Sequence, residues 1–256
     1  MELHNSKIID QYALFWYNTS AMSNPEIAKA LNLRVGEKVP GELLRRLPSV
    51  DEVVHRIRTE IPVLPDIGFF MHFAPAKSIM PINKPGIIHH QREHGANVGT
   101  LLIPKLLLEQ ARGRIVPSHF IEAAGWFASY HDARRSNDEL DMLHGELIAQ
   151  EIEQDNTGIT RVPKYIRKLV CRMIREHVPE DTHKIHALTR DAKSIDGILW
   201  WRTNDFKPEY FRDMTTVEFL PLVPALLRQT SLELRTQKDG YVAGLRAAAT
   251  IGIINW

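Results

Sequence analysis

The stretch AAGWFASYHDARR, residues 123–135, is a run of small and apolar residues that ends in a histidine, an aspartate and two arginines. The run has the composition of a buried helix, and His131 and Asp132 stand at its end. In one interpretation both side chains form ordinary hydrogen bonds or point to solvent. In the other they are metal ligands, because imidazole nitrogen and carboxylate oxygen together suit first-row divalent cations. The second interpretation requires further ligands on other helices.

Histidines occupy inward or terminal positions on three other predicted helices. The chain has 12 histidines, and nine of them lie between His89 and His186. His94 shares a helical stripe with Val98, and His144 shares one with Ile148, since residues three or four apart lie on the same face. His177 ends an apolar helical face just before a proline. Each histidine alone is compatible with an ordinary core position, but together they favour a common site.

Helical periodicity also dominates the remainder of the chain and predicts an all-α fold. Ser49 and Glu52 have the spacing of a capping box. Residues 61–86 are rich in proline and predict an irregular connection, and Pro104 is expected to kink or divide a long helix. Helices are expected at residues 49–61, 85–110, 118–130, 138–153, 163–177, 182–201, 217–234 and 240–251. The expected organisation is a helical extension (1–65), a helical core (66–205) and C-terminal helices (206–256).

The order of these motifs resembles the HD-domain superfamily of metal-dependent phosphohydrolases. Members have a first histidine on one helix, His-Asp at the end of the next, and a later aspartate. REHGANV (92–98) is similar to the first motif and AGWFASYHD (124–132) to the second. The resemblance covers about residues 86–200 and implies an HD-like helical bundle with extra helices at both ends. It implies metal ligation by His94, His131 and Asp132, with His144 and His177 where two-metal members place additional histidines.

The sequence departs from the family pattern at two positions. Where many members carry a lysine after His-Asp, this chain has Arg135, which keeps the charge but does not readily donate a proton. In ALTRDAKSIDGIL (187–199) the apolar pattern places Lys193 at the last ligand position. Asp191 and Asp196 lie about 200° and 300° away around the helix, at about 100° per residue. We expect Asp191 to complete the metal site through a local shift; otherwise the site lacks one ligand, or Lys193 replaces a metal charge.

The resemblance implies a phosphohydrolase or phosphodiesterase that acts on a nucleotide-like phosphate ester with one or two divalent ions. The resemblance does not identify the metal, which could be Mn, Mg, Zn, Fe, Co or Ni. The expected catalytic residues are Asp132, Arg135 and Lys193. Positive side chains near the phosphate are expected from Arg92, Arg134 and Arg135, because the planar guanidinium group can bind two phosphate oxygens. A degenerate HD-like module that binds a nucleotide or a partner is the first alternative, and Lys193 favours it.

Composition limits the other functional classes. The net charge of +1 does not favour nucleic acid as a partner. Residues 23–47 nevertheless resemble the opening of a helix-turn-helix, so a nucleic-acid-binding protein is the second alternative. The longest apolar stretch is too short to span a bilayer, and the start of the chain lacks the apolar core of a signal peptide. We therefore expect a cytoplasmic protein without a membrane partner, whose apolar C-terminal third completes the bundle or forms a homo-oligomer interface.

Overall fold

The computed structural model describes residues 47–75, 92–135, 143–155, 160–177, 186–199 and 214–256. These residues form an all-α fold, as the sequence predicts, and contain no strand beyond one isolated bridge between Asp66 and Asn255. Among them, no helix combines the length and the apolar character needed to cross a membrane. The helices are α4 (Val50–Glu60), α5 (Ile67–Met71), α6 (Arg92–Ala111), α7 (Ser118–Tyr130), α8 (His144–Gln154), α9 (Lys164–His177), α10 (Ala187–Leu199), α11 (Met214–Glu218), α12 (Leu222–Glu233) and α13 (Gly240–Ile251).

Local capping interactions define several helix ends. At α4 the predicted capping box is present: the Glu52 backbone N–H donates to Ser49 Oγ at 3.2 Å, and the Ser49 N–H donates to Glu52 Oε2 at 2.6 Å. The α13 helix starts after Asp239 and ends at Gly252, whose φ of 90° lies in the left-handed region that favours glycine. The predicted ranges of α7 and α13 are confirmed.

Three sequence expectations were wrong in detail. The connection after α4 contains the short helix α5, because the Asp66 side chain accepts from the Phe69 N–H at 2.7 Å and caps it. The helix expected over residues 217–234 is divided into α11 and α12, with Pro221 as the N-cap of α12. Pro104, in contrast, lies within a continuous α6.

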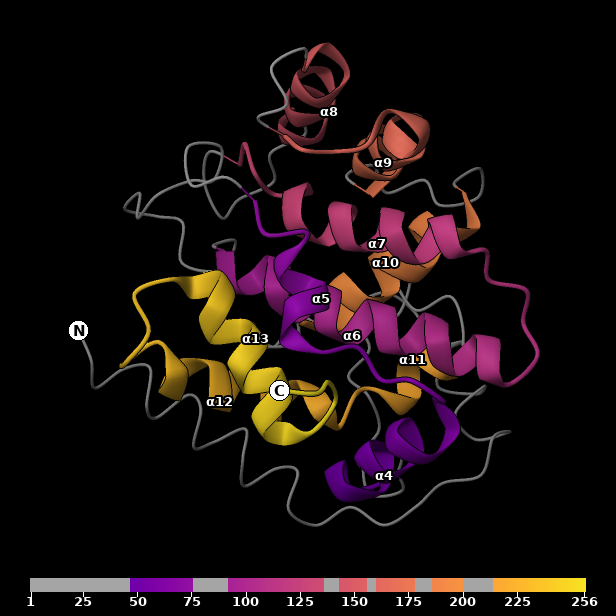
Figure 1. Cartoon of the computed structure of the whole chain (residues 1–256), viewed down its shortest axis with the longest axis vertical. Coiled ribbons are helices and arrows are strands. Elements are labelled where there is room, and N and C mark those ends of the chain that lie inside the picture. Colours follow the sequence, from indigo (N-terminus) through magenta and orange to yellow (C-terminus); the bar gives the residue numbers. More distant parts are fainter. Residues whose placement is uncertain (1–46, 76–91, 136–142, 156–159, 178–185, 200–213) are drawn as a thin grey trace, which may run out of the picture.

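The long helix α6 lies at the centre of the bundle (Figure 1), and 15 of its 20 residues are buried. It packs between α7 on one side and α13 on the other, and α12 covers α13. The pair α8 and α9 packs outside α7, mainly through α9. Figure 1 shows α6 and α7 running antiparallel, joined by the loop of residues 112–117. The start of α6 and the end of α7 therefore lie at the same end of the bundle.

Some sequence expectations lie outside the described residues. These are the possible helix-turn-helix, apart from its last residue, and the expected helical starts at residues 85–91, 138–142 and 182–185.

Candidate metal centre

Six histidine and aspartate side chains from five helical segments meet at one end of the α6–α7 pair. His94 lies in the first turn of α6, and His131 is the C-cap of α7 with Asp132 next to it. His144 is the first residue of α8, His177 the last of α9, and Asp196 lies near the end of α10. The four histidines and Asp132 are each at most 8% exposed. The convergence expected for His94, His131, Asp132, His144 and His177 is therefore present.

Asp132 lies between two pairs of histidines. Its Oδ2 atom is 3.4 Å from His94 Nε2 and 3.3 Å from His131 Nε2. Its Oδ1 atom is 3.4 Å from His144 Nε2 and 4.0 Å from His177 Nε2. Asp196 Oδ1 lies 3.0 Å from His94 Nε2, on the side of the first pair. The Asp132 carboxylate therefore lies between the pair His94–His131 and the pair His144–His177, with one oxygen toward each pair.

Backbone hydrogen bonds orient two of the imidazole rings. His131 Nδ1 lies 3.1 Å from the carbonyl oxygen of Ala128, and His177 Nδ1 lies 2.6 Å from that of Ile174. A carbonyl oxygen only accepts, so Nδ1 carries the proton in both rings. In the neutral ring this leaves a lone pair on Nε2, which faces the cluster. Such backbone contacts are the usual way in which a protein fixes a metal-binding imidazole.

Two histidines of the cluster, His131 and His177, have pKa values shifted in opposite directions. Burial lowers the pKa of His131, but the charges of Asp132 and Asp196 outweigh burial and raise this pKa to about 9. For His177, burial together with the positive charges of His131 and His144 lowers the pKa to about 3. Burial raises the pKa of Asp196, but the hydrogen bond and charge of His94 outweigh it and hold this pKa well below its usual value. Asp196 is therefore ionised and His177 is a neutral donor, as a metal requires, whereas His131 would release a proton on binding a metal.

The donors form two groups that could each hold a metal ion. His94, His131 and Asp196 make one group and Asp132, His144 and His177 the other, with the ligand atoms of each group within 4.8 Å of one another. Within each group two Nε2 atoms face one another at 3.3 Å, in the pairs His94–His131 and His144–His177. Imidazole and carboxylate donors in this combination suit first-row divalent cations. The residues present therefore fit one or two such ions.

Asp191, the carboxylate expected at this site, lies elsewhere. Its Oδ1 atom is 3.2 Å from Lys105 Nζ, and its Oδ2 atom is 2.9 Å from Arg114. Glu109 completes this second cluster through contacts with both Lys105 and Arg114. Asp191 precedes Asp196 by five residues, which places it about 140° away around α10. The structure thus places Asp196, and not Asp191, beside His94.

The structure separates the expected phosphate-binding residues. Arg135 is buried, and its guanidinium lies 3.3 Å from Asp132 Oδ1, at the cluster. Arg134 forms an exposed ion pair with Glu151 at 2.7 Å. Arg92 is also engaged away from the cluster, in an ion pair with Asp239 at 3.2 Å and a hydrogen bond to the carbonyl oxygen of Pro75.

Lys193, expected at the last ligand position, is buried on α10 one turn before Asp196. The sequence did contain a signal for Asp196 itself. Residues three apart lie on one helical face, so a site facing Lys193 is within reach of Asp196 as well. Asp196 lies about 300° from Lys193 in one direction around the helix, which is only about 60° in the other direction.

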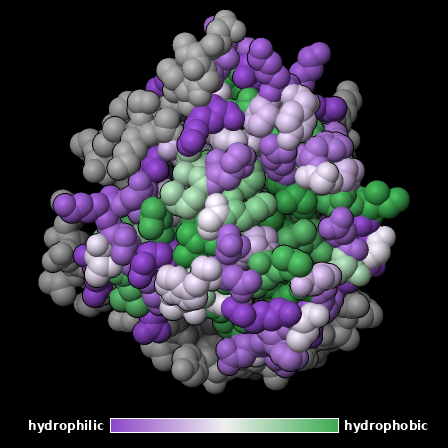
Figure 2. Space-filling model, viewed as in Figure 1, coloured by the Kyte–Doolittle hydropathy of each residue, from purple (hydrophilic) through white to green (hydrophobic). Residues whose placement is uncertain are grey.

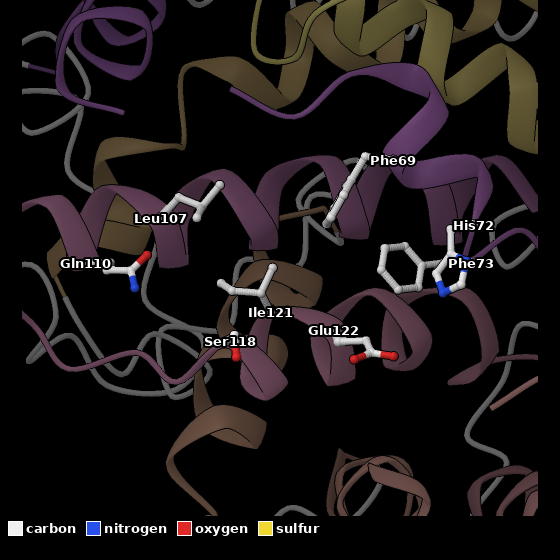
Figure 3. Close-up of a pocket in the computed structure, with 8 residues that line it drawn as sticks. All are labelled: Phe69, His72, Phe73, Leu107, Gln110, Ser118, Ile121 and Glu122. Carbon is white, nitrogen blue, oxygen red and sulfur yellow. The ribbon is translucent and has the colours of Figure 1, made fainter. Parts of the chain in front are cut away.

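A separate apolar pocket of about 550 Å³ lies between α5, α6 and α7 (Figure 3). Figure 2, drawn in the view of Figure 1, shows apolar side chains gathered across the middle of this face of the molecule. Glu122, the charged residue of the pocket, precedes His131 by nine residues, or about 13 Å along a helix. None of the described residues that line it is an arginine or lysine, so this lining does not suit a phosphate group. It is lined by Phe69, His72, Phe73, Leu107, Gln110, Ser118, Ile121 and Glu122.

Comparisons of the chain with protein-family models, with curated proteins and with solved structures give no match.

Proposed function

We propose that the protein is a metal-dependent phosphohydrolase or phosphodiesterase that acts on a nucleotide-like phosphate ester. The observation that carries this proposal is the position of Asp132, with one carboxylate oxygen toward each of two histidine pairs. Paired cation sites that share a carboxylate suit phosphate-ester hydrolysis. The similarity of the His94 and His131–Asp132 motifs to the HD-domain superfamily supports the same chemistry.

Bound divalent cations would polarise a phosphoryl oxygen and lower the pKa of nearby water. The chain's own residues supply the other requirements. The backbone carbonyls of Ala128 and Ile174 hold His131 and His177 in the tautomer that binds a cation. Arg135, at the cluster, is the side chain best placed to bind phosphate oxygens, and Lys193 on α10 is a second candidate.

The position of Asp196 favours the catalytic proposal over the alternative of a catalytically degenerate module. That alternative depended on Lys193 at a position where a carboxylate ligand is expected. A carboxylate is present beside the first histidine pair, because Asp196 Oδ1 lies 3.0 Å from His94 Nε2. A carboxylate beside the first histidine pair supports the catalytic proposal.

The proposal is tested with the purified protein and a panel of phosphate esters. The panel contains nucleoside monophosphates, deoxynucleoside triphosphates, cyclic dinucleotides and a chromogenic phosphodiester, each with added Mn²⁺, Mg²⁺ or Zn²⁺. We expect hydrolysis that depends on the metal, and at least a thousandfold loss in Asp132→Asn, because this change removes the shared charge but keeps the side-chain shape. Arg112→Gln is the control, because Arg112 pairs with Glu60 and Glu218 far from the cluster. Absence of metal-dependent hydrolysis with every ester, in a folded wild-type protein, would exclude the proposal.

A further inference from the structure

We infer that Arg135 makes the two cation positions of the proposed metal centre unequal, so that one ion is bound tightly and the second is bound weakly until an anionic substrate arrives. This inference rests on the proposed function. It concerns the order in which the site is filled, and it assigns to Arg135 a role in metal loading as well as in phosphate binding.

The two positions differ first in their donors. The position beside His94 and His131 has two carboxylates. Asp132 Oδ2 lies 3.4 Å from His94 Nε2 and 3.3 Å from His131 Nε2, and Asp196 Oδ1 lies 3.0 Å from His94 Nε2. The position beside His144 and His177 has a single carboxylate oxygen, Asp132 Oδ1, among the described residues. A hard divalent cation gains most of its affinity from anionic oxygen donors. The first position therefore binds a cation more tightly.

Arg135 increases this difference. Its guanidinium NH1 lies 3.3 Å from Asp132 Oδ1, the same oxygen that serves the second position. Arg135 is only 9% exposed, and a guanidinium keeps its charge at any working pH. The group therefore occupies part of the acceptor capacity of Oδ1 and repels a second cation nearby.

A phosphate group changes this balance. Its oxygens can accept from Arg135 and at the same time supply anionic ligands to the second position. The guanidinium would then face the phosphate instead of competing for Asp132. A phosphate anion and the second cation are therefore expected to bind cooperatively, and each increases the affinity for the other.

The test is a titration of the full chain with Mn²⁺. Calorimetry measures the heat of binding, and electron paramagnetic resonance measures the concentration of free Mn²⁺. We expect two binding phases in the wild type, separated by at least about tenfold in Kd. Inorganic phosphate should tighten only the weak phase. Arg135→Gln removes the charge but keeps a hydrogen-bond donor, and should tighten the weak phase by about tenfold or more, from the Coulomb energy of a nearby unit charge. Arg135→Lys, which keeps the charge, should leave the phases far apart.

Matched variants identify the phases. Arg134→Gln removes the same charge one residue earlier, from the exposed pair with Glu151, and should change neither phase. His144→Ala should remove the weak phase alone, and His94→Ala should remove the tight phase. Circular dichroism checks that each variant is folded. If Arg135→Gln does not fold, the His144→Ala titration and the phosphate effect in the wild type decide the question.

The outcomes separate this inference from the proposed function. Two equal phases in the wild type, or an unchanged weak phase in a folded Arg135→Gln variant, would overturn the inference and leave the metal centre intact. Complete absence of Mn²⁺ binding would instead remove the basis of the proposed function, and the inference with it.

Discussion

Two aspartates on α10 have opposite surroundings although only five residues separate them. Asp196 faces the histidines, where its Oδ1 lies 3.0 Å from His94. Asp191 pairs with Lys105, which is completely buried, and with the exposed Arg114. One carboxylate is thus placed to bind a cation that comes from solution, and the other neutralises cations of the protein itself. Their substitution should have different consequences.

Asp196→Asn should lower the affinity for Mn²⁺ by at least about tenfold, because a charged ligand becomes a neutral one. It should also lower the free energy of unfolding by about 2 kcal/mol, because attraction by His94 and His131 outweighs burial and repulsion by Asp132 and stabilises the ionised Asp196. Asp191→Asn should cost about 3 kcal/mol of stability, since it leaves buried positive charge unbalanced, and should not change Mn²⁺ affinity. Urea unfolding and metal titration measure the two quantities. Equal loss of metal affinity in both variants would contradict this assignment.

The sequence predicts five of the six clustered side chains, because each of these histidines stands on an apolar helical face or at a helix end, as Asp132 does. It predicts the wrong aspartate for the sixth. The angular offset of Asp196 from Lys193 is small, but the apolar pattern of α10 does not show how the helix is rotated about its own axis. This rotation depends on tertiary contacts, including the pairing of Asp191 with Lys105 on α6.

The close contact between α6 and α7 depends on small residues. A Cβ atom added at Gly95 would lie 2.7 Å from the carbonyl oxygen of Ala128, whereas one added at Gly99 would lie 3.4 Å from the Cβ of Ala128. The first contact is with the backbone and cannot be relieved by a side-chain rotation. Gly95 is adjacent to His94, and Ala128 accepts the hydrogen bond that orients His131. The distance between these two helices therefore determines the distance between the two histidines.

Gly95→Ala should destabilise the protein by about 1–3 kcal/mol, the usual cost of overpacking, although alanine is the better helix former. Gly99→Ala is the matched control on the same helix. It should be neutral or stabilising by up to about 1 kcal/mol, because its new methyl group meets Ala128 at an ordinary contact distance. Thermal unfolding measures both. A stable Gly95→Ala variant with unchanged metal affinity would show that the contact tolerates a wider spacing.

Helix ends are predictable where the capping residues are local, as with Ser49 and Glu52 at α4. They are less predictable where a proline has several allowed roles. Pro104 remains inside α6, while Pro221 starts a new helix after a turn. Proline removes one backbone donor in either case, and the surrounding packing decides whether the helix continues.

Across the whole molecule, the cluster links parts of the bundle that share few other contacts. The α8–α9 pair packs mainly on α7, with α10 as its other neighbour, while α6 is held by α7 and α13. The donors come from α6, the end of α7, α8, α9 and α10. Bound cations would therefore tie the outer pair of helices to the central helix, and should stabilise the whole fold.

Mn²⁺ at about a hundred times its Kd should add about 2.7 kcal/mol to the free energy of unfolding. For a chain of this size that corresponds to an increase in Tm of roughly 5–10 °C. Differential scanning calorimetry with added Mn²⁺, and again after chelation, measures this shift. Asp132→Asn should show little or no increase, whereas Arg112→Gln should respond as the wild type does. An identical increase in Asp132→Asn would place the stabilising ions elsewhere.

The distribution of the donors along the chain also determines when the site can exist during protein synthesis. His94 is made first, and Asp196 follows about a hundred residues later. A chain that has left the ribosome only as far as α7 carries His94, His131 and Asp132 without the other three donors. Since domains are synthesised from the N-terminus at about 5–20 residues per second, this partial set persists for several seconds before α10 is complete. The chain therefore acquires its full donor set only after the two helices that carry the first three donors have been made.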